Sequence, residues 1–530
     1  MLFNSAAYGA FLLAAYVVFW ALRRRTLLRP LFLTVASYGF YFYGTWEAAT
    51  EQEVPLGPLG WSALCLAIIF VGSSLDFYIG KALGRTESPG RRKALLLASV
   101  VYYLGVLSVF KYFNFAVDSF ATVASWAGVP VSPVHLRLVL PFGISFFTFE
   151  TMSYTIDVYR REIPPADRYL DYLLFVCFFP HLVAGPIVRP RTMLPQLAAM
   201  PVATDERKAH GLYLIATGLL KKIVIGDMLS INLVNRVFDN PERYSSLEVL
   251  VAVYGYAIKI YADFSGYSDV AIGSAHLFGY ELPKNFDAPY ISQSVQEFWR
   301  RWHMSLSAWL RDYLYISLGG SRRGPWMTYR NLMLTMLLGG LWHGASWNFV
   351  IWGGLHGGGL ALERAVDEKR VGKMLLVALP ACGLLALLIP ARAWAAMGAT
   401  VGVALACGVM LGALKHASGA PMTALRVVIM FHFACLCWIF FRAPTFDHAI
   451  LVLGRLAKLS VGTANLAPKV LAALAVGLVA HALPKKVDEA IRDAFVKSPA
   501  LVQGIALAVC AYIVHFAMGA KSEPFVYGQF

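Results

Sequence analysis

Long apolar runs separated by short polar segments make up most of the chain. The first of them cover Ala6–Leu22, Leu31–Trp46, Trp61–Gly80, Ala94–Val117 and Leu136–Ile156. Their lengths approach the ~20 residues that an α-helix needs to cross the hydrocarbon core of a bilayer. The apolar pattern therefore predicts a protein with many membrane-spanning helices.

The charges between these runs alternate along the chain and predict an orientation. Basic residues follow the first, third and fifth runs, whereas the connections after the second and fourth runs begin without Lys or Arg. Because Lys and Arg concentrate in cytoplasmic loops, we expect the N-terminus outside and Arg23–Arg25, Arg91–Lys93 and Arg160–Arg161 inside. Lys111 and Arg137 are exceptions to this alternation.

The pattern changes at the short run Leu170–Ala184, which has basic residues on both sides. A run too short to span, with the same charge sign at both ends, predicts a re-entrant segment, and such backbone is tolerated only inside protein or beside a cavity. Further apolar runs follow at Gly211–Ile225, Leu247–Ala262, Asn331–Trp352, Met374–Leu388, Trp394–Leu414, Leu425–Phe441, Val470–Leu483 and Ala500–Met518. We expect an all-α, polytopic membrane protein with about ten to thirteen transmembrane or re-entrant helices, some broken or tilted.

Composition supports this class and excludes others. Hydrophobic residues make up 58% of the 530-residue chain and charged residues 15%, whereas a soluble chain has ~45–50% and ~25%. This excludes a soluble enzyme, a disordered tail and a disulfide scaffold. The net charge is +15, and because the basic residues flank apolar runs, we assign them to cytoplasmic loops and anionic lipid headgroups rather than to nucleic acid. The seven cysteines contain no C-x-x-C pair, so no metal site is predicted.

Polar residues gather in an unusual way between Asp263 and Leu360. In the stretch Glu297–Tyr315, aromatic and aliphatic residues recur at three- and four-residue steps, which predicts a helix. Arginines lie off that stripe, as is typical of a helix in the plane of the membrane interface. His303 lies in this stretch and is either a polar member of an interfacial helix or a site residue.

His343 lies near the middle of an otherwise apolar run. An ionisable side chain there is costly unless it is satisfied, which makes it a functional candidate. The alternative is a core histidine bonded to a neighbour such as a backbone carbonyl. Glycines four positions apart, which allow close helix packing, would wall a narrow cavity around it: Gly340 and Gly344, Gly353 and Gly357, Gly354 and Gly358. His356 falls roughly opposite His343 at about 100° per residue, and we interpret it as structural.

Other catalytic patterns are weak. The segment from Gly344 to Asn348 is not a G-x-S-x-G elbow, and neither a P-loop nor H-E-x-x-H occurs. Asp263 and Asp269 form either an acid pair or bonded members of a packed turn, since buried charges are paired.

Five long motifs carry a family resemblance. They are PFGISFFTFETMSYTIDVYR (Pro141–Arg160), FPHLVAGPIVRP (Phe179–Pro190), DFSGYSDVAIG (Asp263–Gly273), FWRRWHMSLSAWLRDYLYISLGG (Phe298–Gly320) and GLWHGASWNFVIWGGLHG (Gly340–Gly357). Together they resemble the membrane-bound O-acyltransferase family, in particular its bacterial alginate O-acetyltransferase branch. The similarity is spread over most of the chain and extends to the tail Glu523–Phe530.

The resemblance implies one integral membrane domain, with N-terminal helices in residues 1–135, the catalytic core in 136–360 and C-terminal helices in 361–530. It implies transfer of an acyl group from a cytoplasmic thioester, with acetyl-CoA as the expected donor substrate and no bound cofactor, to an extracytoplasmic polysaccharide such as alginate. The family's hallmark histidine falls on His343 and its second polar position on His303. A neutral imidazole there can accept the acceptor's proton or can itself be acylated.

The same resemblance implies a multi-pass protein of the bacterial inner membrane and a separate periplasmic or membrane-anchored, esterase-like partner. Two other functions stay open. One is D-alanyl or other acyl transfer to teichoic acid or another envelope glycan. The other is a transporter or channel with His343 on a proton path, although the chain lacks the internal duplication that many transporters carry.

Arginines on and after the amphipathic stretch are candidates for binding the donor. Arg300, Arg301, Arg322 and Arg323 are the predicted contacts to donor phosphates, with Arg311 near them, because guanidinium groups bind phosphate through paired hydrogen bonds. The alternative is that they anchor the helix to anionic lipid at ~1 kcal/mol each.

Overall fold

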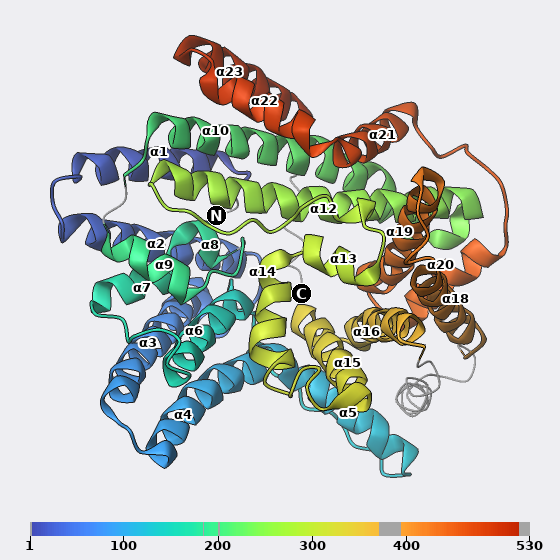
Figure 1. Cartoon of the computed structure of the whole chain (residues 1–530), viewed down its shortest axis with the longest axis horizontal. Helices are drawn as coiled ribbons and strands as arrows, with labels where there is room; N and C mark the ends of the chain where they lie inside the picture. The colour runs from blue at the N-terminus through green and yellow to red at the C-terminus, as the bar shows by residue number, and fades with distance from the viewer. Residues whose placement is uncertain (1–2, 184, 200–201, 370–393, 519–530) are drawn as a thin grey trace.

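The structure is a computed structural model that describes residues 3–183, 185–199, 202–369 and 394–518, and every regular element in them is a helix (Figure 1). Four helices are long and apolar enough to cross a membrane: Gly57–Arg85, Pro89–Trp126, Ala420–Arg442 and Ala500–Ala517. A bent pair, Pro468–Ala482 with Lys485–Lys497, would make a fifth span. The all-α, polytopic class is confirmed. The predicted run Met374–Leu388 and the tail Glu523–Phe530 lie outside the described residues.

Fewer candidate spans are found than the ten to thirteen embedded helices that we expected. The reason is that several apolar runs do not form a single uncharged helix. The run Gly211–Ile225 begins in α10 (Asp205–Leu219) and continues in a π-helical segment, η2 (Leu220–Asp227). The longest helix, α12 (Ser246–Leu277), carries charged residues along its length. The total of embedded helices stays a prediction.

In the N-terminal part, helix ends that carry basic residues lie next to one another, as expected if they share one side of the membrane. It contains α1 (Ala6–Ala21), α2 (Leu28–Thr50), α3 (Gly57–Arg85), and α4 (Pro89–Leu107) joined to α5 (Phe113–Trp126) through η1 (Ser108–Tyr112). Arg92 is buried and donates Nη1 to the carbonyl of Leu83 at 2.5 Å and Nη2 to that of Tyr159 at 2.7 Å. The C-terminal ends of α3 and α6 (Ile144–Tyr159) therefore lie side by side. Which side faces the cytoplasm stays a prediction.

The predicted helix Leu136–Ile156 is wrong in its first part, because α6 begins only at Ile144 and the chain before Pro141 has no regular structure. Gly143 has a φ of +68°, and a Cβ atom there would lie 2.2 Å from the carbonyl oxygen of Leu182. A glycine in the left-handed region allows this close contact. The tertiary contact therefore sets where the helix starts.

The predicted re-entrant segment Leu170–Ala184 is a pair of short helices broken at Phe178, and Ala184 itself is outside the described residues. The helices are α7 (Tyr169–Cys177) and α8 (Phe179–Leu182), followed by α9 (Pro190–Ala198). Residues 171–182 are all buried in protein, as irregular backbone at membrane depth requires. Passage into the membrane and back stays a prediction.

α10 and α12 run side by side across the molecule (Figure 1). A Cβ atom at Gly218 would lie 2.6 Å from the carbonyl oxygen of Gly266, so small residues set the distance between the two helices. Short elements connect and follow them: η3 (Ser230–Val234), α11 (Asn235–Asp239), η4 (Pro241–Arg243) and η5 (Pro289–Ile291). The DFSGYSD motif lies inside α12, so the packed turn expected around Asp263 and Asp269 is wrong.

The carboxylates of Asp263 and Asp269 are nevertheless bonded, as the pairing of charges inside proteins predicts. Asp263 lies 2.9 Å from Lys222 Nζ, and Asp269 lies 2.7 Å from Lys221 Nζ. Because each carboxylate pairs with a different lysine, the two aspartates do not form an acid pair.

The helices that carry the two candidate histidines lie at the centre of the molecule (Figure 1). They are α13 (Val295–Arg301), α14 (Met304–Trp309), η6 (Leu310–Tyr315), α15 (Gly324–His343) and α16 (Trp347–Asp367). α15 and α16 cross at Gly340 and Gly353, where a Cβ atom would lie 2.2 Å from the carbonyl oxygens of Phe349 and Met336, respectively. The close packing predicted from the glycine spacing is confirmed at these two positions, whereas Gly358 has open space around it.

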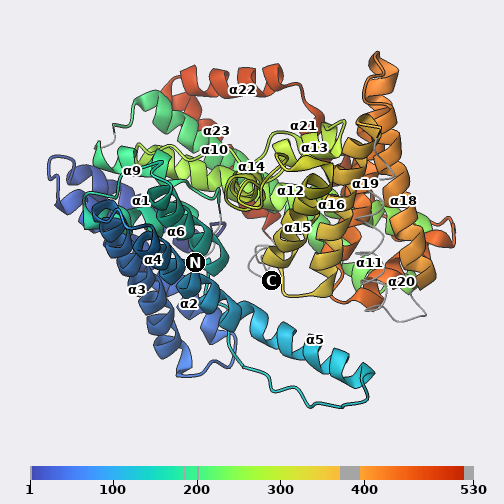
Figure 2. The same cartoon turned by 60° about the horizontal axis from the view of Figure 1, so that its bottom comes forward.

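Of the C-terminal helices, the first two pack on α16. In chain order, the C-terminal helices are α18 (Trp394–Ala413), α19 (Ala420–Arg442), α20 (Phe446–Ala457), α21 (Pro468–Ala482), α22 (Lys485–Lys497) and α23 (Ala500–Ala517). α22 and α23 pack along α10, whereas α5 projects away from the body of the molecule (Figure 2). α23 leaves large apolar side chains exposed, including Leu501 and Phe516, which is the surface that a lipid-facing helix presents.

Candidate active site

His343 is the last residue of α15 and is buried in an aromatic cage. Its ring centroid lies 5.0 Å from those of Trp342 and Trp352 and 5.4 Å from that of Phe441. These rings come from α15, α16 and α19. The predicted burial of His343 between closely packed helices is confirmed.

Lys111 holds the end of α15 that carries His343. Its ammonium donates to the carbonyl oxygen of Trp342 at 2.7 Å and to that of His343 at 3.1 Å. The last carbonyls of a helix have no partner within the helix, and a cation is favourable at that end. Sequence reasoning treated Lys111 only as an exception to the charge pattern. The signal that points to it is the one used for His343, a lone ionisable residue in an apolar run.

His303 is fully buried and lies at a break in the chain between α13 and α14, with a left-handed backbone (φ +42°). The expected single amphipathic helix over Glu297–Tyr315 is therefore wrong, whereas the position of this segment relative to the membrane interface stays a prediction. The predicted apolar stripe, which includes Trp302, Leu306 and Leu310, is buried in protein instead.

Asn285 fixes the position and tautomer of His303. Its Oδ1 lies 3.1 Å from His303 Nδ1 and also accepts hydrogen bonds from the backbone and hydroxyl of Ser305, while its Nδ2 donates to Ser268. The donors around Oδ1 identify it as the oxygen of the amide, so His303 Nδ1 carries the proton and Nε2 is the basic nitrogen. Asn285 is a site residue that sequence reasoning missed.

The two histidine rings lie close to each other. Their centroids are 6.4 Å apart, and Trp342 lies near both, at 6.2 Å from His303. The two imidazoles are therefore close enough to belong to one site.

His356 belongs to the same aromatic cluster. The ring of Trp352 lies 5.0 Å from His343 and 4.9 Å from His356, so it separates the two histidines. His356 is fully buried, and neither ring nitrogen has a hydrogen-bond partner among the described residues. Its structural assignment stays a prediction.

The four arginines predicted to bind the donor lie in two places. Arg300 and Arg301 end α13, where Arg300 is exposed and Arg301 forms an ion pair with Glu297 at 2.8 Å. Arg322 and Arg323 are exposed in the turn before α15. Because α15 has 20 residues and rises ~1.5 Å per residue, this turn lies ~30 Å from His343 along the helix.

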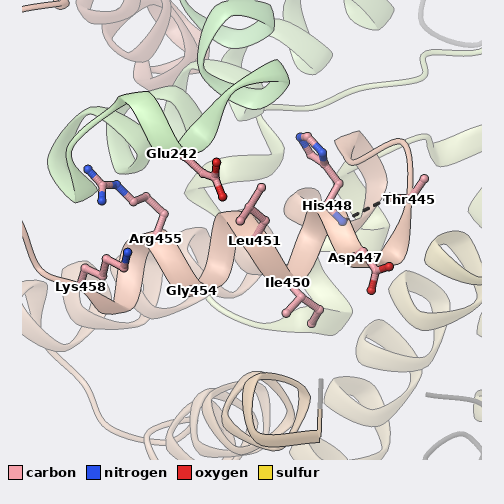
Figure 3. A pocket seen from close by; sticks show the side chains of 9 residues that line it. All are labelled: Glu242, Thr445, Asp447, His448, Ile450, Leu451, Gly454, Arg455 and Lys458. Atoms are coloured by element: carbon pink, nitrogen blue, oxygen red, sulfur yellow. Dashed lines mark hydrogen bonds between the residues drawn. The ribbon is translucent and has the colours of Figure 1, made fainter. Parts of the chain in front are cut away.

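A cavity of about 710 Å³ opens along α20, lined by polar side chains that include Glu242, Asp447 and Lys458 (Figure 3). It lies near the His343 end of α15 and α16, because Asn348 of α16 donates Nδ2 to the carbonyl of Ala443 at 2.8 Å. Thr445, two residues further, lines the cavity. The cavity and the Arg322–Arg323 turn are therefore at opposite ends of α15.

These features define an all-helical, polytopic membrane protein with a buried pair of histidines. A sequence profile of the membrane-bound O-acyltransferase family matches residues 160–369, which include both histidines. The chain is 34% identical over 386 residues to a peptidoglycan O-acetyltransferase of Helicobacter pylori, covering 68% of each protein. The chain belongs to the membrane-bound O-acyltransferase family.

Two further relatives carry different names. A probable alginate O-acetylase of Azotobacter vinelandii is 43% identical over 343 residues, which are 64% of this chain and 64% of the relative. A teichoic acid D-alanyltransferase of Bacillus subtilis is 32% identical over 254 residues, which are 43% of this chain and 59% of the relative. The chain thus spans less than two thirds of the length of these two relatives.

Proposed function

We propose that this protein is a membrane O-acyltransferase that moves an acetyl group from cytoplasmic acetyl-CoA across the membrane for O-acetylation of an extracytoplasmic polysaccharide such as alginate. The burial of His343 beside His303, with ring centroids 6.4 Å apart, carries the proposal. The names of the Azotobacter and Helicobacter relatives support acetyl transfer to a glycan of the cell envelope.

The two histidines supply proton transfer and orientation. In the proposed reaction, the oxygen of the acceptor hydroxyl bonds to the thioester carbonyl carbon while the imidazole of His343 takes the hydroxyl proton. The carbon–sulfur bond then breaks, and the proton passes to the leaving thiolate, which gives an ester and a thiol. Because the Nδ1 proton of His303 is bonded to Asn285, its Nε2 accepts rather than donates a hydrogen bond, and in the proposal His303 orients the substrates for the reaction. The aromatic cage excludes water and so protects the acyl group from hydrolysis.

Buried indole groups near the histidines support binding of a polar ligand. The Nε1 atoms of Trp302 and Trp352 are buried and have no acceptor among the described residues. The ring of Trp352 contacts that of His343, and the ring of Trp438 lies 4.9 Å from that of Trp302. Most buried donors in proteins have a partner, so these N–H groups are suited to a carbonyl oxygen of the donor or a hydroxyl of the acceptor.

The arrangement of α15 supports transfer from one side to the other. The turn with Arg322 and Arg323 lies before its first residue, and His343 is its last. In the proposal, Arg322 and Arg323 contact donor phosphates at the cytoplasmic surface, and Arg300 and Arg301, at the end of α13, contact the donor nearer to His303. The acceptor approaches from the side of the cavity along α20, near His343.

In this proposal the protein lies in the bacterial inner membrane, where it can meet both a cytoplasmic thioester and an extracytoplasmic glycan. A separate periplasmic or membrane-anchored, esterase-like partner protein completes transfer to the sugar.

A second candidate function is D-alanyl transfer to teichoic acid, which the similarity to the Bacillus protein supports.

Incubating the purified protein with labelled acetyl-CoA, partner and glycan tests the proposal. Wild-type protein is expected to transfer label, and His343→Ala is expected to abolish transfer while it inserts and folds normally. His135→Ala is the matched control, because His135 is exposed and lies outside the core. Near wild-type acetylation by His343→Ala would falsify the catalytic assignment, whereas label accepted only from a D-alanyl thioester would favour the second function.

A further inference from the structure

The segment that connects α8 with α9 is irregular backbone inside the protein. Residues 185–189 form no helix, and all five are buried. We call them the 185–189 segment. Irregular backbone at membrane depth is tolerated only where other groups of the protein satisfy its N–H and C=O groups. The partners of this segment therefore show which parts of the molecule it connects.

Glu150 of α6 is the partner of one backbone group of the segment. Its Oε1 accepts the N–H of Val188 at 2.9 Å and lies 3.1 Å from Nδ1 of His181 in α8. The side chains of Glu150 and His181 are both fully buried. A carboxyl group in such a position is costly unless it is paired and hydrogen-bonded. Neither residue has a role in the proposed reaction.

The neighbouring residue of the segment bonds to the groups around His303. Ile187 donates its N–H to Ser305 Oγ at 2.9 Å, and the Ser305 hydroxyl donates to Asn285 Oδ1 at 2.9 Å. Asn285 Oδ1 in turn lies 3.1 Å from His303 Nδ1. A continuous series of contacts therefore leads from Glu150, through two adjacent residues of the segment, to the ring of His303.

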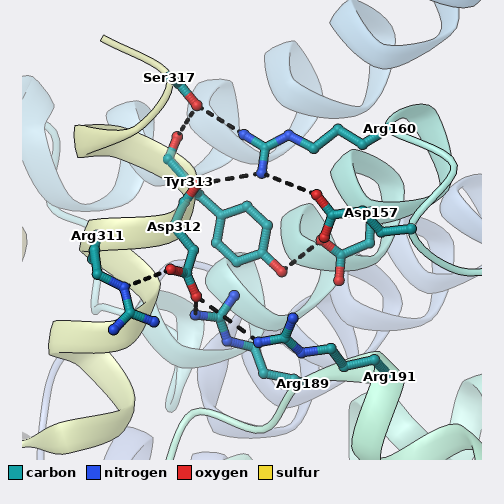
Figure 4. A network of polar contacts seen from close by, with 9 residues as sticks. Asp157, Arg160, Arg189, Arg191, Arg311, Asp312, Tyr313 and Ser317 are labelled. Carbon is teal, nitrogen blue, oxygen red and sulfur yellow. Dashed lines mark hydrogen bonds and ion pairs between the residues drawn. The ribbon is translucent and has the colours of Figure 1, made fainter. Parts of the chain in front are cut away.

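The end of the segment is fixed separately. Arg189 forms an ion pair with Asp312 of η6 at 3.2 Å, and Arg191 and Arg311 lie beside the same carboxylate (Figure 4). This ion pair holds the segment against η6. The segment is thus bonded to Glu150 of α6 on one side and to α14 and η6 on the other.

The residue before Glu150 packs tightly against the helix that carries Ser305. Phe149 stacks on Trp309 of α14 with ring centroids 3.7 Å apart, and its carbonyl oxygen accepts the indole N–H of Trp309 at 2.8 Å. The Phe149 ring also lies 5.2 Å from that of Trp342. Because packed interiors transmit displacements, a shift of the 185–189 segment is expected to reach Ser305.

We propose that Glu150 and His181 are positioning residues for His303. They act through the 185–189 segment, which holds Ser305 and thereby the amide of Asn285. The inference rests on the proposed function, in which His303 orients the substrates. A functional side chain has to be held to within about 0.5 Å by such supporting bonds. Loss of the bonds is therefore expected to lower the rate of transfer more than the affinity for the substrates.

The two carboxyl oxygens of Glu150 differ in a way that suggests a conservative variant. Oε2 is buried without a hydrogen-bond partner among the described residues, whereas Oε1 lies between Val188 and His181. The amide oxygen of a glutamine can take the place of Oε1, because it also accepts two hydrogen bonds. Methionine fills a similar space but offers only a weakly accepting sulfur. Glu150→Gln is therefore expected to retain the function that Glu150→Met loses.

A double-mutant cycle on acyl transfer by the full-length protein in nanodiscs tests the inference. The variants are Glu150→Met, Ser305→Ala and the two combined, with kcat and KM measured per amount of folded protein. Each single substitution is expected to lower kcat about tenfold or more and to leave KM within about threefold. The double variant is expected to be no slower than the slower single variant, because both act through one connection. Independent, multiplying losses would overturn the inference.

Two further variants separate positioning from a general loss of stability. Glu150→Gln is expected to keep kcat within about threefold of wild type, since it keeps the accepting oxygen. Tyr102→Phe is the matched control, because it removes one hydrogen bond to backbone elsewhere, from the Tyr102 hydroxyl of α4 to the Ile68 carbonyl of α3 at 2.9 Å. Its kcat is expected to equal that of wild type. A control as slow as Glu150→Met, or Glu150→Gln as slow as Glu150→Met, would contradict the inference.

The position of His303 in the variants gives a readout that needs no acyl transfer. Cryo-electron microscopy of Glu150→Met is expected to show the 185–189 segment displaced and His303 turned away from Asn285. Should this variant not fold, Ser305→Ala breaks the connection at its other end and is expected to displace His303 while Val188 stays bonded to Glu150. An unmoved His303 in the folded variant would overturn the inference. Wild-type protein that transfers no acetyl group, with His303 displaced in the variants, would contradict only the proposed function.

Discussion

Replacing Gly353 with alanine tests whether the close crossing of α15 and α16 positions His343. A Cβ atom at Gly353 would lie 2.2 Å from the carbonyl oxygen of Met336, whereas ordinary van der Waals contact begins at 3.4 Å. The obstacle is backbone rather than a flexible side chain, so the two helices have to separate locally by the difference, about 1.2 Å. Overpacking of this kind costs about 1–3 kcal/mol.

The separation also acts on the site, because Trp352 precedes Gly353 and its ring lies 5.0 Å from that of His343. A misplacement of about 1 Å lowers the rate of an enzyme by about 100-fold. We therefore expect Gly353→Ala to lower kcat for acetyl transfer by about this factor and to lower the thermal stability of the purified protein moderately.

Gly358→Ala is the matched control in the same helix. A Cβ atom at Gly358 meets nothing within 4 Å, and alanine in a helix is favoured over glycine by about 0.5–1 kcal/mol. This variant is expected to keep the wild-type rate and to be at least as stable. Wild-type rate and stability in Gly353→Ala would refute the reasoning, because the tight crossing would then not determine where His343 lies.

Three further predictions concern other parts of the structure. Lys111→Met removes two charge-assisted bonds at the end of α15, so we expect a loss of about 2 kcal/mol in stability and at least tenfold lower transfer, measured by thermal unfolding and label incorporation. Asn285→Leu releases His303 and is expected to lower kcat more than it raises KM; unchanged kinetics would contradict the tautomer assignment. Single cysteines at the exposed positions Arg91 and Gln52, in a cysteine-free background, test the orientation: an impermeant maleimide applied to intact spheroplasts should label position 52 and not position 91, and the reverse result refutes the charge argument.

Local patterns in the sequence are enough to define the class of the protein and its principal histidine. Contiguous apolar runs predict helices because a backbone in lipid has to satisfy its hydrogen bonds within the segment. His343 is recognisable because a lone ionisable residue in such a run is costly without a purpose. The four-residue spacing of Gly340 and Gly344, and of Gly353 and Gly357, also predicts close packing, because small residues let helix backbones approach each other.

The sequence predictions fail where a contact distant along the chain overrides the local pattern. The stripe around His303 has the period of one continuous helix, yet the chain breaks there, where the amide of Asn285 bonds to both His303 and Ser305. Lys111 looked like an exception to the charge pattern because its partner, the carbonyl of Trp342, lies 231 residues further along the chain.

The sequence by itself therefore determined the helical membrane class, the family resemblance and the burial of His343, since each follows from residues close together in the chain. Only the tertiary structure decided which groups surround that histidine. Arg189 pairs with Asp312, for example, although the two residues are 123 positions apart in the chain. Such groups meet because helices pack across the core, and a periodic pattern of apolar residues specifies which face of a helix is buried but not which partner it meets.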